Sequence, residues 1–332
     1  MLNKSLNLNP KFFDSDVEQK PTRAGFGTGL VTLGKENPNV VVLTADLSGS
    51  TKTDAFAKEF PDRFFDIGVA EQNMASVAAG FGVSGKTAFI SSYATFSPGR
   101  NWEHIRTTIV YNNADVKIAG HHSGTMTGPD GATHQATEDI AITRAWPNMD
   151  VIVPCDNIQA EKATIAAGKK YGPMYLRFSR DKTPVITTSE TPFEIGKSYI
   201  YWESENPVAT IAATGYMVAY ALLAAKQLEE EGIPTLVVNV ASVKPLDEQL
   251  LTDVVGRTKC LVTVEDHQVM GGLGGALAEF FAKTQPVPIE FIGLQNTFAE
   301  SGTPAQLLEK YGMGKDAIIA ATKRAIERKE TR

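Results

Sequence analysis

Glu71 stands at the expected start of an apolar helix, in the sequence VAEQNMASVAAGFGV of residues 69–83. One explanation is that an acid in the first helical turn is favoured by the helix dipole, by about 0.3–1 kcal/mol at an exposed site. The alternative is that the small residues after Glu71 let the helix pack closely against a neighbour. The carboxylate would then lie in a dry site, where it could exchange a proton with a ligand nitrogen. The local pattern alone favours the first explanation.

A second candidate is the loop GPDGATHQ, residues 128–135. Its two glycines allow sharp turns, and Asp130 and His134 lie four residues apart, where both side chains could reach one ligand. A carboxylate and an imidazole together suit hydroxyl recognition and proton transfer. The alternative is a glycine-rich turn whose Asp and Thr cap a helix that begins near HQATEDIA. The local sequence leaves both explanations open.

Two arginines and a serine could together bind a phosphate group. Arg180 follows the apolar run PMYLRFS, Arg23 precedes an expected helix, and Ser50 lies in the loop LSGSTKT. The arginine fork matches phosphate oxygens, and a hydroxyl adds a further donor. Isolated surface arginines are the commoner explanation, so only convergence in space would favour a phosphate site.

Other conspicuous patterns predict neither a metal site nor a dinucleotide site. His121 and His122 are adjacent at an expected strand end without further ligands at suitable spacing, so we expect one of them in a pocket and no protein-only metal site. The sequence GGLGG of residues 271–275 does not match G-x-G-x-x-G, and tight packing between a strand and a helix explains it more simply. Cys155 and Cys260 are far apart and are expected to be buried thiols.

These residues follow short apolar or β-branched runs that alternate with helical patterns, which predicts an α/β fold with a parallel sheet covered on both faces. In such sheets functional loops lie past the carboxyl ends of the strands. The runs in the first part of the chain are NVVVLTADL, RFFDIGV, TAFISSYATF, DVKIAGHH, MDVIVPCD and PMYLRFSR. Those in the second part are PVATIAATG, PTLVVNVAS, KCLVTVEDH and PIEFIGL.

Residues 181–206 lose this rhythm and are rich in Pro, Ser, Thr and Glu, as an inter-domain connection would be. We therefore place a domain boundary near residue 190. Residues 1–190 form the first predicted domain, and residues 191–332 form a second, smaller α/β domain.

Composition restricts the classes of partner. The chain has 332 residues, of which 42% are hydrophobic, with 32 basic and 38 acidic side chains. Because like charges form no block, we expect neither nucleic acid nor an anionic membrane as partner, while a small polyanionic substrate stays possible. No apolar run reaches the roughly 18 residues of a membrane span, and the N-terminal sequence has no leader pattern, so we expect a cytoplasmic protein.

Taken together, RFFDIGVAEQNMASVAAGFG, SSYATFSPGR, TGPDGATHQATEDIAITRAWPNMDVIVPCD and YLRFSR resemble the transketolase family in order and spacing. The D-G-x-T-H-Q run followed by PNM and P-x-D is specific to transketolases and the related deoxyxylulose-phosphate synthases. G-x-A-E-Q is shared more widely among thiamine diphosphate enzymes. The resemblance implies a pyrimidine-binding domain up to about residue 190 and a transketolase C-terminal domain after it.

The family binds the cofactor diphosphate and its magnesium through a separate domain with a G-D-G motif, and no GDG occurs in this sequence. The chain therefore resembles the C-terminal subunit of a split transketolase. The resemblance implies an N-terminal partner subunit that carries the diphosphate-binding domain and Mg²⁺ (or Ca²⁺), with thiamine diphosphate between the chains. The simplest assembly is a heterotetramer of two copies of each chain.

The resemblance implies which residues of this chain contact the cofactor. Glu71 matches the glutamate that contacts the aminopyrimidine nitrogen of thiamine diphosphate and shares a proton with it. Phe96 matches an aromatic residue that packs on the pyrimidine. The positions three and six residues further on, aromatic in familiar transketolases, are Gly99 and Trp102. Trp102 keeps a ring at the cofactor, whereas Gly99 departs from the family pattern.

The remaining matches concern the sugar phosphate substrate. His134 and Asp130 match residues that contact the sugar near its reacting carbons and hydroxyls. The residues that match the phosphate-binding set are Arg180, Arg23, Ser50 and His121.

The implied reaction transfers a two-carbon ketol unit from a ketose phosphate to an aldose phosphate, as in the pentose phosphate pathway. The closest alternative is a split enzyme for an unusual sugar phosphate or a sulfosugar. A deoxyxylulose-phosphate synthase normally carries G-D-G in the same chain, and the β subunit of a 2-oxo acid dehydrogenase would not carry DGATHQ. A non-catalytic partner subunit would not be expected to keep the four residues Glu71, Asp130, His134 and Arg180.

Overall fold

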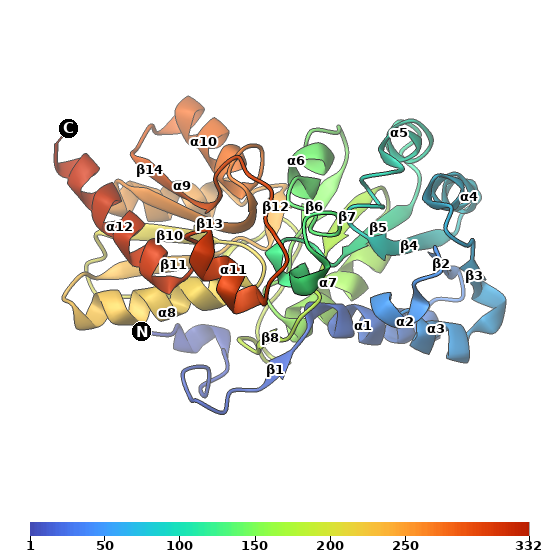
Figure 1. The fold of residues 1–332 in the computed structure, drawn as a ribbon, viewed down its shortest axis with the longest axis horizontal. Coiled ribbons are helices and arrows are strands. Elements are labelled where there is room, and N and C mark those ends of the chain that lie inside the picture. The colour runs from blue at the N-terminus through green and yellow to red at the C-terminus, as the bar shows by residue number, and fades with distance from the viewer. Residues whose placement is uncertain (332) are drawn as a thin grey trace.

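The computed structural model describes residues 1–331 and contains two mixed sheets, each covered by helices (Figure 1). The first sheet has seven strands in the order β12-β6-β7-β5-β4-β2-β3. Its strands are β2 (Val40–Thr44), β3 (Phe64–Asp66), β4 (Thr87–Tyr93), β5 (Val116–His121), β6 (Asp150–Ile152), β7 (Met174–Arg177) and β12 (Ser242–Lys244). Neighbouring strands are parallel except β12, which pairs antiparallel with β6 at one edge.

Helices cover both faces of this sheet because the side chains of its buried strands alternate between two apolar clusters. On one face Val40 and Val42 join the cluster of α1 (Thr22–Glu36) and α7 (Asn157–Lys169). On the other face the sheet packs against α4 (Glu71–Val83) and the π-helical segment η3 (Ile105–Val110). The shorter helical segments are α2 (Ser48–Thr51), α3 (Asp54–Glu59), η2 (Pro61–Arg63), α5 (Trp102–His104), η4 (Thr125–Asp130) and α6 (Asp139–Arg144).

The close contact between α1 and α7 depends on glycine. A Cβ at Gly25 would lie 1.8 Å from the carbonyl oxygen of Asn157, and one at Gly29 would lie 2.8 Å from Cβ of Thr164. These helices can therefore approach only because α1 lacks side chains at the contact. The contact fixes the start of α1, where Arg23 lies.

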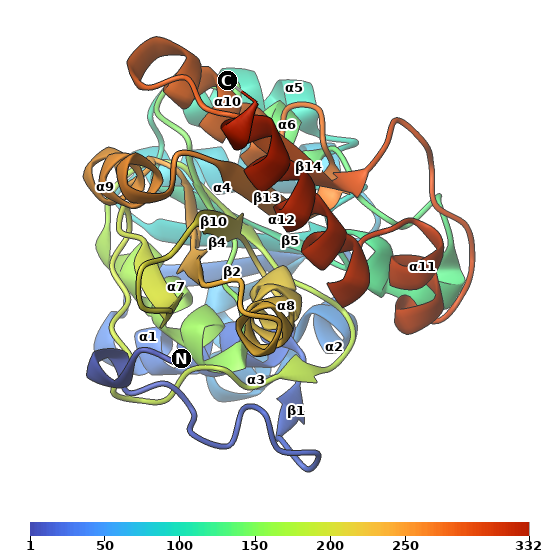
Figure 2. The same cartoon turned by 90° about the vertical axis from the view of Figure 1, so that its left-hand side faces the viewer.

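The second sheet has the order β14-β13-β10-β11-β9, with β9 antiparallel to β11. Its strands are β9 (Tyr199–Glu203), β10 (Ala209–Ala213), β11 (Thr235–Asn239), β13 (Leu261–Gln268) and β14 (Ile289–Leu294). On one face lie α8 (Met217–Glu230) and α12 (Lys315–Glu330), which crosses the sheet diagonally in Figure 2. On the other face lie α9 (Glu248–Thr258) and α10 (Leu273–Thr284), and α11 (Pro304–Lys310) packs near η4.

The α/β fold class and all ten predicted strands are confirmed. Residues 181–206, predicted as an inter-domain connection, also contain two strands that the sequence did not predict, β8 (Thr183–Pro184) and β9. The first sheet is not purely parallel, because β12 joins its edge from beyond residue 190. The boundary near residue 190 falls between β8 and β9, which belong to different sheets, and stays a prediction.

The two halves share a core, since one apolar cluster contains Met74 and Ala78 of α4 together with Leu251 of α9 and Leu277 of α10. The N-terminal segment also joins them. The amide of Asn3 donates to Tyr201 in β9, and β1 (Gln19–Lys20) pairs with β8 after the short helix η1 (Lys4–Leu6).

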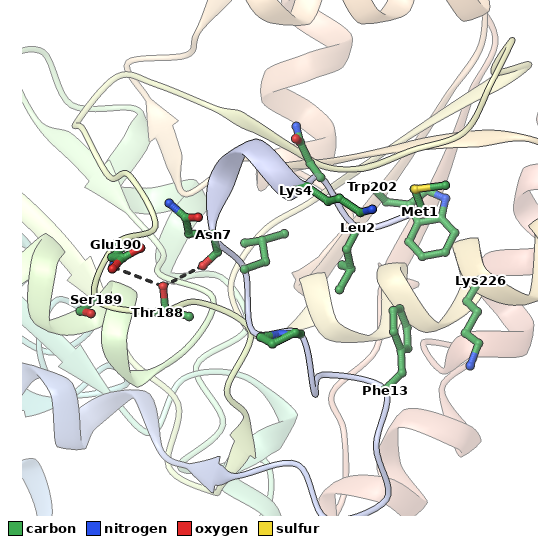
Figure 3. A pocket seen from close by; sticks show the side chains of 13 residues that line it. Met1, Leu2, Lys4, Asn7, Phe13, Thr188, Ser189, Glu190, Trp202 and Lys226 are labelled. Atoms are coloured by element: carbon green, nitrogen blue, oxygen red, sulfur yellow. Dashed lines mark hydrogen bonds between the residues drawn. The ribbon is translucent and has the colours of Figure 1, made fainter.

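Beneath this N-terminal segment lies a groove of about 800 Å³, shown in Figure 3. Phe13, Trp202 and Lys226 line one end of it, and residues 188–190 line the other. The hydroxyl of Thr188 donates to the carbonyl oxygen of Asn7 across the groove (Figure 3). None of the helices in residues 1–331 has the length and apolar character needed to cross a lipid bilayer.

Candidate active site

Glu71 is the first residue of α4 and is buried, with 1% of its side chain exposed. The turn between β3 and α4 places it there, because Gly68 adopts φ 72° and its amide donates to Oδ1 of Asp66. A side-chain nitrogen of Asn101 also donates to the backbone carbonyl of Glu71 at 3.0 Å. Glu71 is therefore a buried acid, and the explanation as an exposed first-turn residue is wrong.

Arg100 contacts Glu71 and is a residue that the sequence analysis missed. Its Nη1 donates to Oε2 of Glu71 at 2.6 Å, and its Cζ lies 4.5 Å from the centroid of the Phe96 ring. An arginine four residues after a phenylalanine could have suggested a cation–π contact. The ion pair with Glu71 could not be predicted, because Glu71 lies 29 residues before Arg100 in the chain. Only the folding of the segment after β4 against α4 brings them together.

Gly99 stands where familiar transketolases have an aromatic residue, and the structure gives a steric reason for the glycine. A Cβ at Gly99 would lie 2.1 Å from the carbonyl oxygen of Thr95, so any side chain would collide with the turn that carries Phe96 and Arg100. Trp102 follows this turn at the start of α5 and packs on Trp146, with ring centroids 5.3 Å apart. Trp102 is half-exposed, and its assignment to the cofactor stays a prediction.

Four rings from three different segments contact one another in a chain, and one of them, Phe96, contacts Arg100. Tyr93, the last residue of β4, stacks on His122 at 3.8 Å and lies 5.9 Å from Phe96. His134 meets Phe96 edge-on at 5.5 Å. His134 therefore reaches the Phe96 ring, and the GPDGATHQ loop and the segment after β4 form one continuous site.

The second half of the chain holds the GPDGATHQ loop in place. The carboxylate of Asp266, in β13, accepts hydrogen bonds from the amide and hydroxyl of Thr125, from the amide of Met126 and from the hydroxyl of Tyr216. Nε2 of Gln135 donates to the carbonyl oxygen of Glu300. The loop and the residues just before it are thus fixed by bonds to residues 140 to 165 positions away.

The helix-cap explanation for this loop is wrong. The next helix, α6, begins at Asp139, and its N-cap residue Glu138 makes no capping hydrogen bond with its side chain. Asp130 instead lies 3.7 Å from Nη1 of Arg180, which also donates to the carbonyl oxygen of Thr127 at 2.7 Å. The loop residues are therefore directed toward the candidate phosphate set rather than toward a helix.

The two candidate phosphate-binding arginines lie on adjacent segments. The amide of Ser179 donates to Oγ1 of Thr22 at 2.7 Å, so Arg180 and Arg23 follow two residues that contact each other. Burial, followed by the positive charge of Arg180, lowers the pKa of Arg23. Nη1 of Arg23 donates to the backbone carbonyl of Ser50 at 2.6 Å, whereas its buried Nε has no hydrogen-bond partner among residues 1–331. Two adjacent cations with spare donors suit an anion, and the explanation as isolated surface arginines does not fit.

The structure separates the two adjacent histidines. His121 ends β5 and is fully buried between Phe26 and Phe178, and burial lowers its pKa well below the ordinary value. His122 has φ 54°, which turns it away from the strand and onto Tyr93. Its pKa is lowered to about 3 by burial, then by Arg23, Arg180 and His134. His121 is therefore enclosed by two Phe rings, whereas His122 packs on Tyr93, a ring of the candidate site.

The remaining patterns have structural roles. The GGLGG segment opens α10, and the carboxylate of Glu265 accepts hydrogen bonds from the amides of Leu273 and Gly274 there. A Cβ at Gly272 would lie 2.0 Å from Oε2 of Glu265, which confirms the tight packing. Both cysteines are buried free thiols, as predicted. Within the described 331 residues, no group of three or more His, Cys, Asp or Glu side chains is arranged to hold a metal ion.

Comparison with known protein families identifies the type of domain that each half of the chain forms. Residues 18–185 match the model of the transketolase pyrimidine-binding domain, and residues 198–318 match that of the transketolase C-terminal domain. Buried Glu71 and Phe96 lie in the first of these.

Several known proteins are similar over most of the chain. A protein named as a transketolase C-terminal section from Methanocaldococcus jannaschii is 45% identical over 302 residues, which cover 90% of this chain and 94% of that protein. The 6-deoxy-6-sulfo-D-fructose transketolase subunit SqwH of a Clostridium species is 35% identical over 320 residues, with coverages of 96% and 99%. Human transketolase is 33% identical over 91% of this chain, which spans 48% of that longer protein.

Among solved structures, one described as a split gene transketolase in an inactive β4 tetramer is 43% identical. It superposes with a TM-score of 0.86 over 94% of this chain and 100% of that chain. Transketolase from Campylobacter jejuni, at 24% identity and a TM-score of 0.79 over 95% of this chain and 49% of that one, shows the shared fold.

The chain belongs to the transketolase family, as the sequence motifs predicted, and it is similar over most of its length to two proteins described as split-gene or C-terminal-section forms. Members of this family are transferases that depend on thiamine diphosphate.

Proposed function

We propose that this chain is the C-terminal subunit of a two-chain transketolase, which transfers a two-carbon ketol unit from a ketose phosphate to an aldose phosphate. The observation that carries the proposal is the buried Glu71 carboxylate, which Arg100 links to the Phe96 ring. His134 meets the same ring, Arg180 lies beside Asp130 in the loop of His134, and the Arg23 segment contacts the Arg180 segment. A buried acid next to an aromatic face suits the aminopyrimidine of thiamine diphosphate. The paired cations suit the phosphate of the sugar.

When bound, thiamine diphosphate supplies the nucleophilic carbon that accepts the ketol unit. This chain's residues bind, orient and move protons around it. Glu71 holds the proton at the pyrimidine nitrogen, and Phe96 packs on the pyrimidine ring. His134 and Asp130 bind the sugar hydroxyls near the reacting carbons.

The phosphate set consists of Arg23, Arg180 and Ser50. We add His122, which is stacked beside these cations, in preference to the enclosed His121. With a pKa of about 3 in the free chain, the His122 imidazole is neutral and donates one N–H to the phosphate.

The diphosphate and its Mg²⁺ (or Ca²⁺) belong to the N-terminal partner subunit in this proposal, with two copies of each chain in the assembly. A related structure, the split gene transketolase described as an inactive β4 tetramer, supports the view that a chain of this type needs its partner for activity. A pentose phosphate substrate is our first choice. The 35% identity to the sulfofructose transketolase subunit, over 96% of this chain, makes a sulfosugar the second candidate.

The decisive experiment reconstitutes the chain with an N-terminal transketolase subunit, thiamine diphosphate and Mg²⁺. We expect formation of sedoheptulose 7-phosphate from xylulose 5-phosphate and ribose 5-phosphate, and no turnover by the isolated chain. Activity of the isolated chain would overturn the two-chain proposal. Activity with 6-deoxy-6-sulfofructose but not with xylulose 5-phosphate would favour the second candidate.

Replacing His122 by Ala should raise the KM for the sugar phosphate about ten-fold in the assembled enzyme, because a hydrogen bond to a charged group is lost. The variant should also lose stability, because His122 is 2% exposed and stacks on Tyr93. His121→Ala should lose stability without a change in KM, since it leaves a cavity between Phe26 and Phe178 at a cost of about 2–4 kcal/mol. Steady-state kinetics of both variants measure the difference in KM, and thermal unfolding verifies that each variant is folded at the assay temperature. A raised KM in His121→Ala but not in His122→Ala would show that His121 is the phosphate ligand.

A further inference from the structure

Arg100 contacts both groups that the proposed function assigns to the cofactor pyrimidine. Its Nη1 bonds Oε2 of Glu71 at 2.6 Å, and its guanidinium carbon lies 4.5 Å from the centroid of the Phe96 ring. The guanidinium and an aminopyrimidine offer the same features, namely a flat face for an aromatic ring and an N–H for a carboxylate. Both cannot occupy the same oxygen and the same ring face.

We propose that Arg100 is a latch on the pyrimidine half of the site. As long as no cofactor is bound, in the chain alone and in the two-chain complex, its guanidinium takes the place of the pyrimidine against Glu71 and Phe96, and the cofactor must displace it to bind. This inference rests on the proposed function, because it concerns the groups to which thiamine diphosphate would bind.

The exposure of the two ionic partners shows which of them can move. The Glu71 side chain is 1% exposed, whereas that of Arg100 is 41% exposed. A buried carboxylate without a partner is costly, so the free chain needs a counter-ion at this place. A half-exposed arginine can supply that charge and can also return to solvent at little desolvation cost, because its polar end is already near water.

The backbone around Glu71 does not depend on Arg100. Asn101 is fully buried, and its Nδ2 donates both to the backbone carbonyl of Glu71 at 3.0 Å and to Oγ of Ser97 at 3.1 Å. These bonds fix the start of α4 to the turn after β4. The Arg100 side chain can therefore leave while the Glu71 backbone stays in position.

The latch lowers the apparent affinity for the cofactor, since only the fraction of molecules with Arg100 displaced is competent to bind. Removing the guanidinium should raise that fraction. In Arg100→Gln we expect thiamine diphosphate to bind about 5- to 20-fold more tightly, a range that corresponds to the loss of one half-exposed charge-assisted contact. Arg100→Lys keeps the positive charge but lacks the planar guanidinium. Its affinity for thiamine diphosphate should lie between those of the wild type and Arg100→Gln.

The test is calorimetric titration of thiamine diphosphate into the two-chain complex at fixed Mg²⁺, with thermal unfolding to verify that each variant folds. The matched control is Arg257→Gln, which removes a guanidinium from another arginine–glutamate pair of 2.6 Å, with Glu203, and should leave the affinity unchanged. In a Glu71→Gln background, Arg100→Gln should have a much smaller effect, because the ion pair is already gone.

Equal or weaker binding to Arg100→Gln, with normal binding to the wild-type complex, would overturn the latch alone. A failure of the wild-type complex to bind thiamine diphosphate would overturn the proposed function and the latch with it. If Arg100→Gln does not fold, the Arg100→Lys complex decides by the same criterion.

Discussion

Replacing Glu71 by Gln will lower the turnover of the assembled enzyme by about 10²–10⁴-fold, the range typical of a lost general acid–base group. Gln keeps the size and the polar contacts of the side chain but cannot take up or release the proton at the pyrimidine nitrogen. Its partner Arg100 is 41% exposed, so water can replace the lost ion pair. The variant should therefore fold and assemble normally.

Steady-state kinetics with a ketose phosphate donor, combined with size-exclusion chromatography of the two-chain complex, measure this effect. Glu59→Gln is the matched control, because Glu59 pairs with Lys35 at 3.1 Å on the exposed surface, where the same substitution should be neutral. If Glu71→Gln keeps nearly full turnover, Glu71 is not the proton partner of the cofactor. If instead it loses activity only because it no longer assembles, its role is structural.

Replacing Asp266 by Ala will destabilise the chain by about 3–5 kcal/mol and will also lower kcat/KM by about 10²-fold. Asp266 is buried and accepts hydrogen bonds from four donors on Thr125, Met126 and Tyr216, which the substitution would leave without partners. The loop that carries Asp130 and His134 would lose its attachment to β13. A displacement of catalytic groups by about 1 Å can cost two orders of magnitude in rate.

Urea unfolding of the chain and kinetics of the assembled enzyme measure the two effects separately. The side chain of Asn has nearly the same shape as that of Asp and keeps one acceptor oxygen. Asp266→Asn should therefore lose less stability and less kcat/KM than Asp266→Ala. Asp253→Ala on the exposed side of α9 serves as a control and should change stability by less than about 0.5 kcal/mol. Normal activity in an Asp266→Ala variant that is destabilised would show that β13 supports the fold but does not position the loop.

The candidate site was predictable from the sequence only in part. The helix headed by Glu71 and the loop GPDGATHQ each follow a predicted strand, and their residue types suggested proton transfer and hydroxyl binding. Neither local pattern could exclude the structural alternative, which was a first-turn acid for Glu71 and a helix-capping turn for the loop. The burial of Glu71 excludes an exposed first-turn residue, and it depends on contacts with Arg100 and Asn101, about 30 residues away in the sequence.

The sequence by itself determined the ten predicted strands and their alternation with helices, because hydrophobic periodicity is a local property that each element carries along its own length. It also determined the family, through motifs that are contiguous in the chain. The tertiary structure alone decided that β12 crosses to the first sheet, that His121 packs between two Phe rings while His122 stacks on Tyr93, and that Arg100 covers Glu71. These outcomes depend on contacts between distant segments, such as the 141 residues between Thr125 and Asp266, and no local pattern contains them.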